Sequence, residues 1–180
     1  MYRSKQGTCT KIILWTGEYV IMKIKILEGI YKELVMNHVH AEWGNPIVTR
    51  GNIINIRNLH GYVAVNEGEL MGAILYEIKN NDCEIVVLYS VTESIGVGTN
   101  LINAVLDMAK ANNCMRVWLI TMNDNTHAIR FYQKRGFDLK AVHINAFDTT
   151  RQLKKLPTEG DFLGIDNIPV KHEFEFEIKL

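Results

Sequence analysis

Two short segments of the chain combine residue types that can bind a phosphate group and move a proton. The first, Ile95–Asn100, is a glycine-bearing turn between a β-rich run and a stretch of helically spaced apolar residues. The second, Asn125–Phe137, carries the amide of Asn125 and the phenol of Tyr132 on what the pattern indicates is one short helix. A phenol can donate a proton, and an amide can orient a ligand. Together they indicate a small-molecule site at the end of a strand.

The glycine turn predicts a place for an anion. Backbone N–H groups in the first turn of a helix have no intrahelical partner and lie at the positive end of the helix dipole. Gly96 and Gly98 would let a phosphate approach the main chain closely. Tight packing of the helix on a sheet explains the same two glycines. A dinucleotide-binding fingerprint is disfavoured because a third spaced glycine is missing. The turn alone leaves phosphate binding and packing both open.

The second segment predicts a short capped helix. Asn125 is a good N-cap, and Gly136 is a typical residue at which a helix ends. Ala128 and Phe131 share one helix face with Tyr132. An amphipathic helix accounts for most of this pattern. It does not account for a phenol on the inward face, which is the feature that points to chemistry.

The elements that must hold these segments follow from the periodicity of the apolar residues. Strands are predicted at Met22–Leu27, Gly61–Val65, Leu70–Ile78, Cys83–Val91, Met115–Thr121, Phe137–Phe147 and Lys171–Leu180. Helices are predicted along a stripe of Ile30, Leu34 and His38, from the glycine turn to Asn112-Asn113, and over Asn125–Arg135. A long polar loop is expected between the last two strands. The pattern is that of a mixed α/β (α+β) domain.

Taken together, the two segments resemble the conserved motifs of the GNAT superfamily of N-acetyltransferases. Ile95–Asn100 is similar to the pyrophosphate-binding pattern Gln/Arg-x-x-Gly-x-Gly/Ala, with Ile95 at the Gln/Arg position and Asn100 at the last glycine. The pattern Asn-x-x-Ala-x-x-x-Tyr-x-x-x-Gly-Phe occurs as Asn125, Ala128, Tyr132, Gly136 and Phe137. The resemblance covers about Tyr62 to Phe137, and the two motifs lie at the family's usual separation.

The resemblance implies a mixed, largely antiparallel central sheet flanked by helices. Its fourth and fifth strands, here Cys83–Val91 and Met115–Thr121, would splay apart to admit acetyl-CoA. Tyr132 would lie near the thioester sulfur and protonate the departing thiolate. The cofactor-binding residues that the resemblance implies are Leu88, Tyr89 and Ser90 for the pantetheine arm, the amides of Gly96, Val97, Gly98, Thr99 and Asn100 for the pyrophosphate, and Asn125 and Tyr132.

Glu84 is the candidate general base. It is an acid within an otherwise apolar strand, and burial raises the pKa of a carboxyl group toward a value suited to accepting a proton. Two alternatives stay open: Glu84 lies at the exposed beginning of the strand, or a neighbouring donor satisfies it. An amine that arrives already deprotonated would need no base.

Composition excludes several function classes. The formal net charge is zero, which disfavours nucleic-acid binding, and the apolar runs are far shorter than a membrane span. Three scattered cysteines, Cys9, Cys83 and Cys114, indicate a reduced, cytoplasmic protein. We predict no metal site. Homodimers occur among family members, and the sequence leaves the oligomeric state open.

The chain is expected to hold one domain over residues 22–180, preceded by an extension over residues 1–21. The extension is either an additional edge strand at Lys11–Leu14 or lies before the natural translation start at Met22. The function expected is transfer of an acetyl group from acetyl-CoA directly to an amine of a small molecule or protein. The rival is a catalytically idle acyl-CoA-binding module that regulates a partner.

Overall fold

The computed structural model describes residues 9–15, 18–91, 95–157 and 160–180. Its centre is an eight-stranded sheet in the order β1-β2-β5-β6-β7-β8-β10-β9. In that order the strands are β1 (Cys9–Trp15), β2 (Glu18–Ile26), β5 (His60–Asn66), β6 (Glu69–Lys79), β7 (Asp82–Ser90), β8 (Arg116–Met122), β10 (Glu173–Lys179) and β9 (Asp138–His143). All neighbours are antiparallel except β7 and β8. The predicted mixed, largely antiparallel sheet is confirmed.

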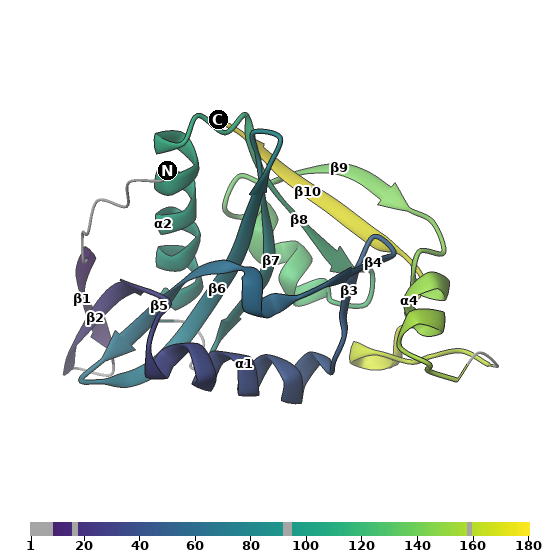
Figure 1. Ribbon diagram of the computed structural model, residues 1–180, viewed down its shortest axis with the longest axis horizontal. Coiled ribbons are helices and arrows are strands. Elements are labelled where there is room, and N and C mark those ends of the chain that lie inside the picture. The colour runs from purple at the N-terminus through teal and green to yellow at the C-terminus, as the bar shows by residue number, and fades with distance from the viewer. Residues whose placement is uncertain (1–8, 16–17, 92–94, 158–159) are drawn as a thin grey trace.

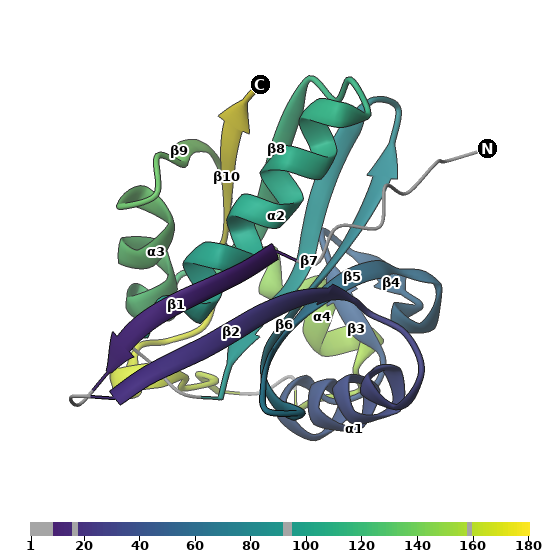
Figure 2. The same cartoon turned by 90° about the vertical axis from the view of Figure 1, so that its left-hand side faces the viewer.

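Helices cover both faces of the sheet, as Figures 1 and 2 show. One face carries α2 (Val97–Ala111) and α3 (Thr126–Gln133). The other carries α1 (Ile30–Trp43), α4 (Phe147–Leu153) and a small hairpin of β3 (Ile47–Thr49) and β4 (Asn52–Ile54). No helix within the described ranges is long and apolar enough to cross a bilayer.

Each face of the sheet buries its own apolar core. The α2 face includes Leu101, Val105 and Phe176, and the α1 face includes Val35 and Val39. Strand β7 contributes to both cores: Cys83 and Ile85 lie in the core on the α2 face, and Val87 and Tyr89 lie in the core on the α1 face. This explains why the strand reads as a nearly unbroken apolar run, because both of its faces are covered.

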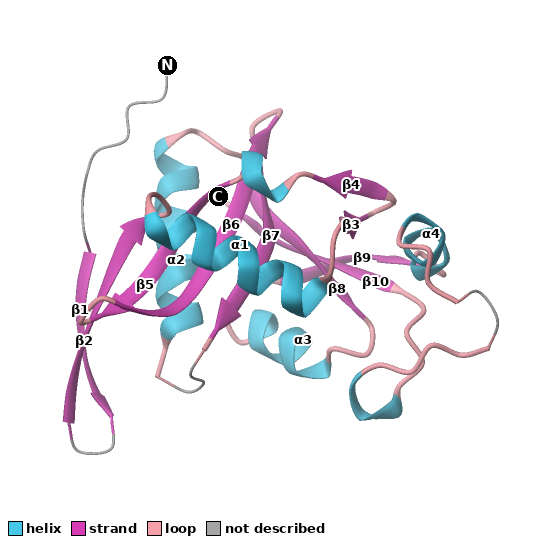
Figure 3. Ribbon diagram, turned by 60° about the horizontal axis from the view of Figure 1, so that its bottom comes forward, coloured by secondary structure: helices cyan, strands magenta, loops and turns pink. Residues whose placement is uncertain are grey.

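The parallel ladder between β7 and β8 has four pairs and ends at Ile85–Leu119. At the same point β7 carries a bulge, because Leu75 pairs with Val87 and Tyr76 with Ile85, which leaves Val86 as the extra residue. A bulge bends a strand and increases its twist. Beyond it the two strands separate toward their C-terminal ends (Figure 3). The predicted divergence of these two strands is therefore present.

Three expectations about individual elements need comment. The apolar stripe predicted for α1 is wrong, because Ile30 and Leu34 are 74% and 46% exposed and the helix buries Val35, Met36 and Val39 instead. The strand predicted over Phe137–Phe147 ends at His143, and Phe147 begins α4 within the expected loop. The edge strand expected at Lys11–Leu14 is present as β1, which pairs with β2.

Candidate active site

The N-terminus of α2 offers unbonded backbone donors. Gly96 is the N-cap residue in the left-handed conformation, with φ 80°, which glycine adopts at little cost. The N–H of Asn100 donates to the Gly96 carbonyl at 3.0 Å, and its side-chain Nδ2 donates to the same oxygen at 2.9 Å. Within the described residues the amides of Val97, Gly98 and Thr99 have no recorded partner. Those three amides, rather than that of Asn100, are available to an anion.

The side chain of Ile95 is only 3% exposed and belongs to the core on the α2 face. It therefore cannot occupy the place of a phosphate-binding Gln or Arg. Conformation and packing single out Gly96 and Gly98 as the two glycines of the Gly-x-Gly pattern. This moves the Gln/Arg position from Ile95 to Glu93, which lies outside the described residues.

Gly98 is required by helix packing. A Cβ at this position would lie 2.9 Å from Cζ of Phe131, so α3 could not pack against α2 as it does. At the next residue, the Thr99 hydroxyl accepts hydrogen bonds from Nε and Nη2 of Arg135 at 2.9 and 2.7 Å. The packing explanation and the anion explanation for the glycine turn are therefore both supported, by different atoms.

The helix α3 is capped as predicted. Oδ1 of Asn125 accepts a hydrogen bond from the N–H of Ala128 at 3.0 Å, and Gly136 has a positive φ of 83° just after the helix. Capping occupies Oδ1 and leaves the amide group Nδ2 of Asn125 as the atom that could contact a ligand.

Tyr132 lies in the core between α3 and the sheet, with edge contacts to Phe131 and Phe137. Its hydroxyl makes no recorded hydrogen bond within the described residues. Burial raises the pKa of Tyr132 above its ordinary value, and the positive charge of Arg135 opposes that rise. The phenol is therefore neutral at physiological pH and can donate a proton.

The end of β7 places its predicted residues on alternating sides. Leu88 packs against the core on the α2 face, and Tyr89 faces α1, where its ring stacks on His38 at 4.0 Å. Ser90 ends the strand. Since the ladder with β8 stops at Ile85, residues 86–89 of β7 have no strand partner on that side among the described residues.

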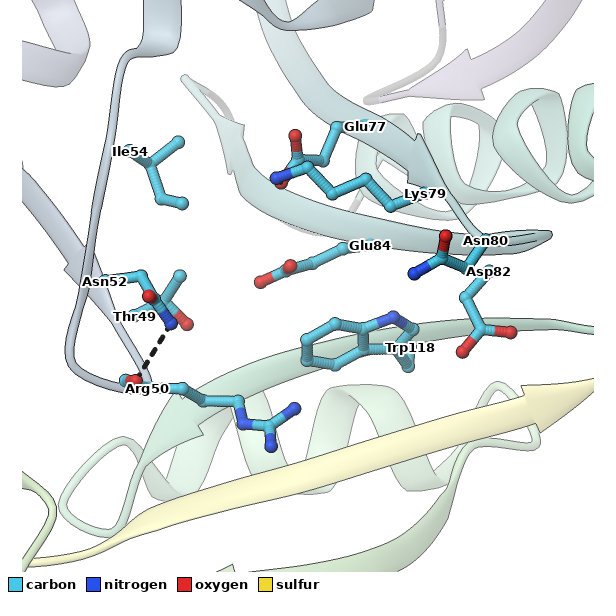
Figure 4. Close-up of a pocket in the computed structure, with 10 residues that line it drawn as sticks. All are labelled: Thr49, Arg50, Asn52, Ile54, Glu77, Lys79, Asn80, Asp82, Glu84 and Trp118. Atoms are coloured by element: carbon cyan, nitrogen blue, oxygen red, sulfur yellow. Dashed lines mark hydrogen bonds and ion pairs between the residues drawn. The ribbon is translucent and has the colours of Figure 1, made fainter.

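Glu84 faces a cavity of about 410 Å³ on the α1 face of the sheet. Figure 4 shows its carboxylate directed from β7 into the space between Trp118 and the β3–β4 hairpin. No hydrogen bond or ion pair to this carboxylate is recorded among the described residues. Burial, reinforced by the negative charge of Glu77, raises the pKa of Glu84 to about 7, while Lys79 and Arg50 act in the opposite direction. The side chain of Glu84 is half-buried near the start of β7, so it is not fully exposed, and the described residues offer it no satisfying donor.

The hairpin wall of the cavity is fixed by Arg50. Its backbone N–H donates to Oε2 of Glu173 at 3.1 Å, and its guanidinium lies over the ring of Trp118, 5.5 Å from the centroid. Nη1 of Arg50 is 3.7 Å from Oε2 of Glu175. Arg50 also lines a second cavity of about 280 Å³ together with His143 and Glu173. It therefore separates two adjoining polar spaces.

Behind this wall, β10 buries three carboxylates on the face opposite to its phenylalanines. Glu173, Glu175 and Glu177 are each at most 6% exposed. Nη1 of Arg116 donates to Glu175 and Glu177, at 2.9 Å each, and its Nε donates to Asp82 at 2.7 Å. The alternation of phenylalanine and glutamate in β10 thus corresponds to two buried faces, one apolar and one ionic.

The structure groups the predicted residues into two sets. The glycine turn, Asn125 and Tyr132 come together where α2 and α3 pack on one face of the sheet. Glu84 lies on the other face, and the divergence of β7 from β8 lies between the two sets. Sequence reasoning missed Arg50, Trp118 and Arg135. Of these three, only Trp118 could have been indicated, by the register of the parallel ladder in which it pairs with Glu84.

Comparison with known proteins identifies the family. The model of the acetyltransferase (GNAT) family matches residues 27–137. The uncharacterized Bacillus subtilis protein YdhI is 43% identical over 127 residues, which cover 69% of this chain and 79% of YdhI. The B. subtilis protein YxbD is 37% identical over 144 residues, 79% of this chain and 89% of that one.

Solved structures agree in fold. A B. subtilis acetyltransferase crystallised in complex with CoA has a TM-score of 0.64 at 20% identity and covers 88% of this chain and 99% of its own. A putative streptothricin acetyltransferase from Bacillus anthracis, in complex with acetyl coenzyme A, has a TM-score of 0.55 at 18% identity over 96% of this chain and 83% of its own. With the family match and the two B. subtilis relatives, the conclusion is direct: the chain belongs to the GNAT family of acetyltransferases.

Proposed function

We propose that the protein transfers the acetyl group of acetyl-CoA directly to an amine of a small molecule or protein. The observation that carries the proposal is the gap that opens between β7 and β8 at the bulged residue Val86. The gap lies between the amides of Val97, Gly98 and Thr99 on one face and the carboxylate of Glu84 on the other, and the described residues provide no partner for either group. A thioester threaded through such a gap would have an anion site at one end and a base at the other.

The chain's atoms fit coenzyme A. The amides of Val97, Gly98 and Thr99 would hold the diphosphate at the positive end of α2. The main chain of β7 at Leu88, Tyr89 and Ser90, beyond the end of the ladder with β8, would pair with the amides of the pantetheine arm in the manner of an added strand. Nδ2 of Asn125 is free to contact the same arm. Acetyl-CoA supplies an activated acyl group, so no covalent intermediate on the protein is needed.

Two side chains would handle protons. Glu84, with a pKa raised to about 7 by burial and by the charge of Glu77, would accept a proton from the incoming ammonium or from the attacking amine. Tyr132, kept neutral by burial, would donate a proton to the departing thiolate. A main-chain N–H of β7 near Leu88 would stabilise the negative oxygen that forms during attack.

The cavity beside Glu84 would receive the acceptor. Its wall combines carboxylates, Arg50 and the indole of Trp118, which suits a polar molecule bearing an amine. It lies on the face opposite to the helix that would hold the diphosphate. The two substrates would thus enter from opposite sides and meet at the bulge, which allows direct transfer within a ternary complex.

The experiment is turnover of acetyl-CoA across a panel of amines, with each product identified by mass spectrometry as an N-acetyl compound. Tyr132→Phe and Glu84→Gln serve as matched variants that change one functional group each. We expect N-acetylation by the wild type and at least a 100-fold lower rate in each variant. Binding of acetyl-CoA without transfer to any amine, peptide N-terminus or lysine would contradict the proposal and favour a regulatory module.

A further inference from the structure

The positive charge of Arg135 stands beside the first turn of α2 and has no carboxylate counter-ion among the described residues. The guanidinium of Arg135, at the end of α3, donates from Nε and Nη2 to the Thr99 hydroxyl and from Nη1 to the Phe131 carbonyl at 2.8 Å. Its carbon Cζ lies 3.4 Å from the centroid of the Phe131 ring. No carboxylate lies within ion-pair distance of it among the described residues. The acceptors that the described part of the chain offers it, a hydroxyl and a carbonyl, are neutral, so they hold the charge in place without compensating it.

The spare capacity of this group matches an anion. A guanidinium has five N–H groups, and three of them are used here. The remaining two, one on Nη1 and one on Nη2, can donate to the oxygens of a phosphate. Since Phe131 and Thr99 fix the side chain, little rotamer entropy would be lost when an anion binds.

The sequence supplies no cation at the Gln/Arg position of the glycine motif. With Gly96 and Gly98 as the two glycines, that position is Glu93, an acid, and Ile95 just before Gly96 is buried in the core. Thr99, which anchors Arg135, is one of the three residues whose amides are unbonded. The guanidinium is therefore held beside the first turn of α2, at the positive end of the helix dipole.

We propose that Arg135 binds the diphosphate of coenzyme A and so supplies from α3 the cationic contact that is missing before Gly96. The inference rests on the proposed use of acetyl-CoA and adds a binding residue to it. The alternative is that Arg135 only joins α2 to α3 through Thr99 and Phe131. The two differ in what the side chain recognises: a phosphate in the first case, and nothing outside the protein in the second.

The test is calorimetric titration of Arg135→Gln and wild type with three probes: acetyl-CoA, acetyl-3′-dephospho-CoA and S-acetylpantetheine, which has no diphosphate. We expect the variant to bind the first two compounds at least 10-fold more weakly, by the same factor. Its affinity for S-acetylpantetheine should stay within twofold of wild type. Arg130→Gln removes an exposed positive charge from the same helix and should leave all three affinities unchanged.

Three results would overturn the inference. One is equal weakening of all three probes, which a structural role predicts. Another is weakening confined to acetyl-CoA, which would place Arg135 at the 3′-phosphate. The third is no change in a variant whose wild-type parent binds acetyl-CoA. A wild type that binds none of the probes would remove the proposed function as well, so the two failures are distinguishable.

A second variant covers the case in which Arg135→Gln folds poorly. Thr99→Val removes the anchoring hydroxyl and keeps the guanidinium charge, so it should lower the melting temperature of the free protein while costing less affinity for acetyl-CoA than Arg135→Gln. A larger affinity loss in Thr99→Val than in Arg135→Gln would count against a role for the charge.

Discussion

Glu84 and Trp118 are register partners in the parallel ladder between β7 and β8, and both side chains line the same cavity. The next pair, Ile85–Leu119, is the last before the strands separate. The unpaired carboxylate therefore stands at the last closed part of the sheet, immediately before the opening. From that position the carboxylate of Glu84, on the α1 face of the sheet, could act on a reaction in the opening between β7 and β8.

The pH profile tests the role of Glu84. The ionised carboxylate is the base, so kcat/KM should rise with pH through about 7 and level off above it. Glu84→Gln should lower kcat/KM by about 100-fold or more and abolish this limb. Glu67→Gln, at an exposed turn, is the control for loss of a negative charge. An unchanged limb in Glu84→Gln would exclude Glu84 as the base.

Glu77 tunes that pKa from the neighbouring strand. It pairs with Glu84 across the β6–β7 ladder, and its negative charge raises the pKa of Glu84. Glu77→Gln removes this repulsion and frees Lys79, which is bonded to Glu77 at 2.8 Å. Both changes favour the ionised form, so the acidic limb of kcat/KM should move to lower pH. A shift to higher pH would contradict the electrostatic account.

Several elements of the fold and of the site could be predicted from the sequence, because they depend on residues that are close together in the chain. The Asn125 cap, the glycine at the end of α3 and the hairpins of the central strands all depend on residues close in sequence. The alternation in β10 was also visible. The burial of its acidic face could not be predicted, because it depends on Arg116 and Arg50, which are distant in sequence from Glu173–Glu177.

What escaped prediction depends on long-range packing. In α1 the apolar positions do not form one clear stripe, and the sheet selected Val35, Met36 and Val39 over Ile30 and Leu34. The register of the glycine motif was displaced by two residues for a related reason. Only the buried position of Ile95 and the contact of Gly98 with α3 identify Gly96 and Gly98 as the two glycines of the motif.

The contact between Gly98 and Phe131 predicts a coupled pair. Gly98→Ala gains about 1 kcal/mol of helix propensity but forces the Phe131 ring to move, at a cost of about 1–3 kcal/mol. Phe131→Leu shortens the side chain and should relieve that clash. Denaturant unfolding of both single variants and the double variant should show a coupling free energy of about 1 kcal/mol or more. Strictly additive effects would mean that the two residues do not touch.

Removing Arg116 should destabilise the ionic face of β10. Burial opposes ionisation of Glu175, but hydrogen bonds from Arg116 and His143 outweigh it and hold its pKa below the ordinary value; for Glu177, bonds from Arg116 and Lys140 do the same. Arg116→Gln leaves carboxylates without their shared cation and should cost about 3 kcal/mol of unfolding free energy at pH 7. The partly exposed Lys140→Gln should cost under about 1 kcal/mol.

The same pair of variants carries a pH signature. A carboxyl group with a lowered folded-state pKa stabilises the fold above its unfolded-state pKa of about 4.5, and this stabilisation is lost as pH falls. Wild type should therefore lose stability as pH drops below about 4.5. The deficit of Arg116→Gln relative to wild type should shrink over the same range. A deficit that grows toward acid pH would contradict the assignment.

The central claim is that coenzyme A lies along the open edge of β7 with its diphosphate on the first turn of α2. Amide hydrogen exchange, measured by mass spectrometry with and without CoA, tests it most directly. The account predicts slower exchange in Leu88–Ser90 and in Val97–Thr99 when CoA is bound, with no such change in the hairpin β3–β4. Saturation with CoA that leaves both segments exchanging at their free rates would contradict it.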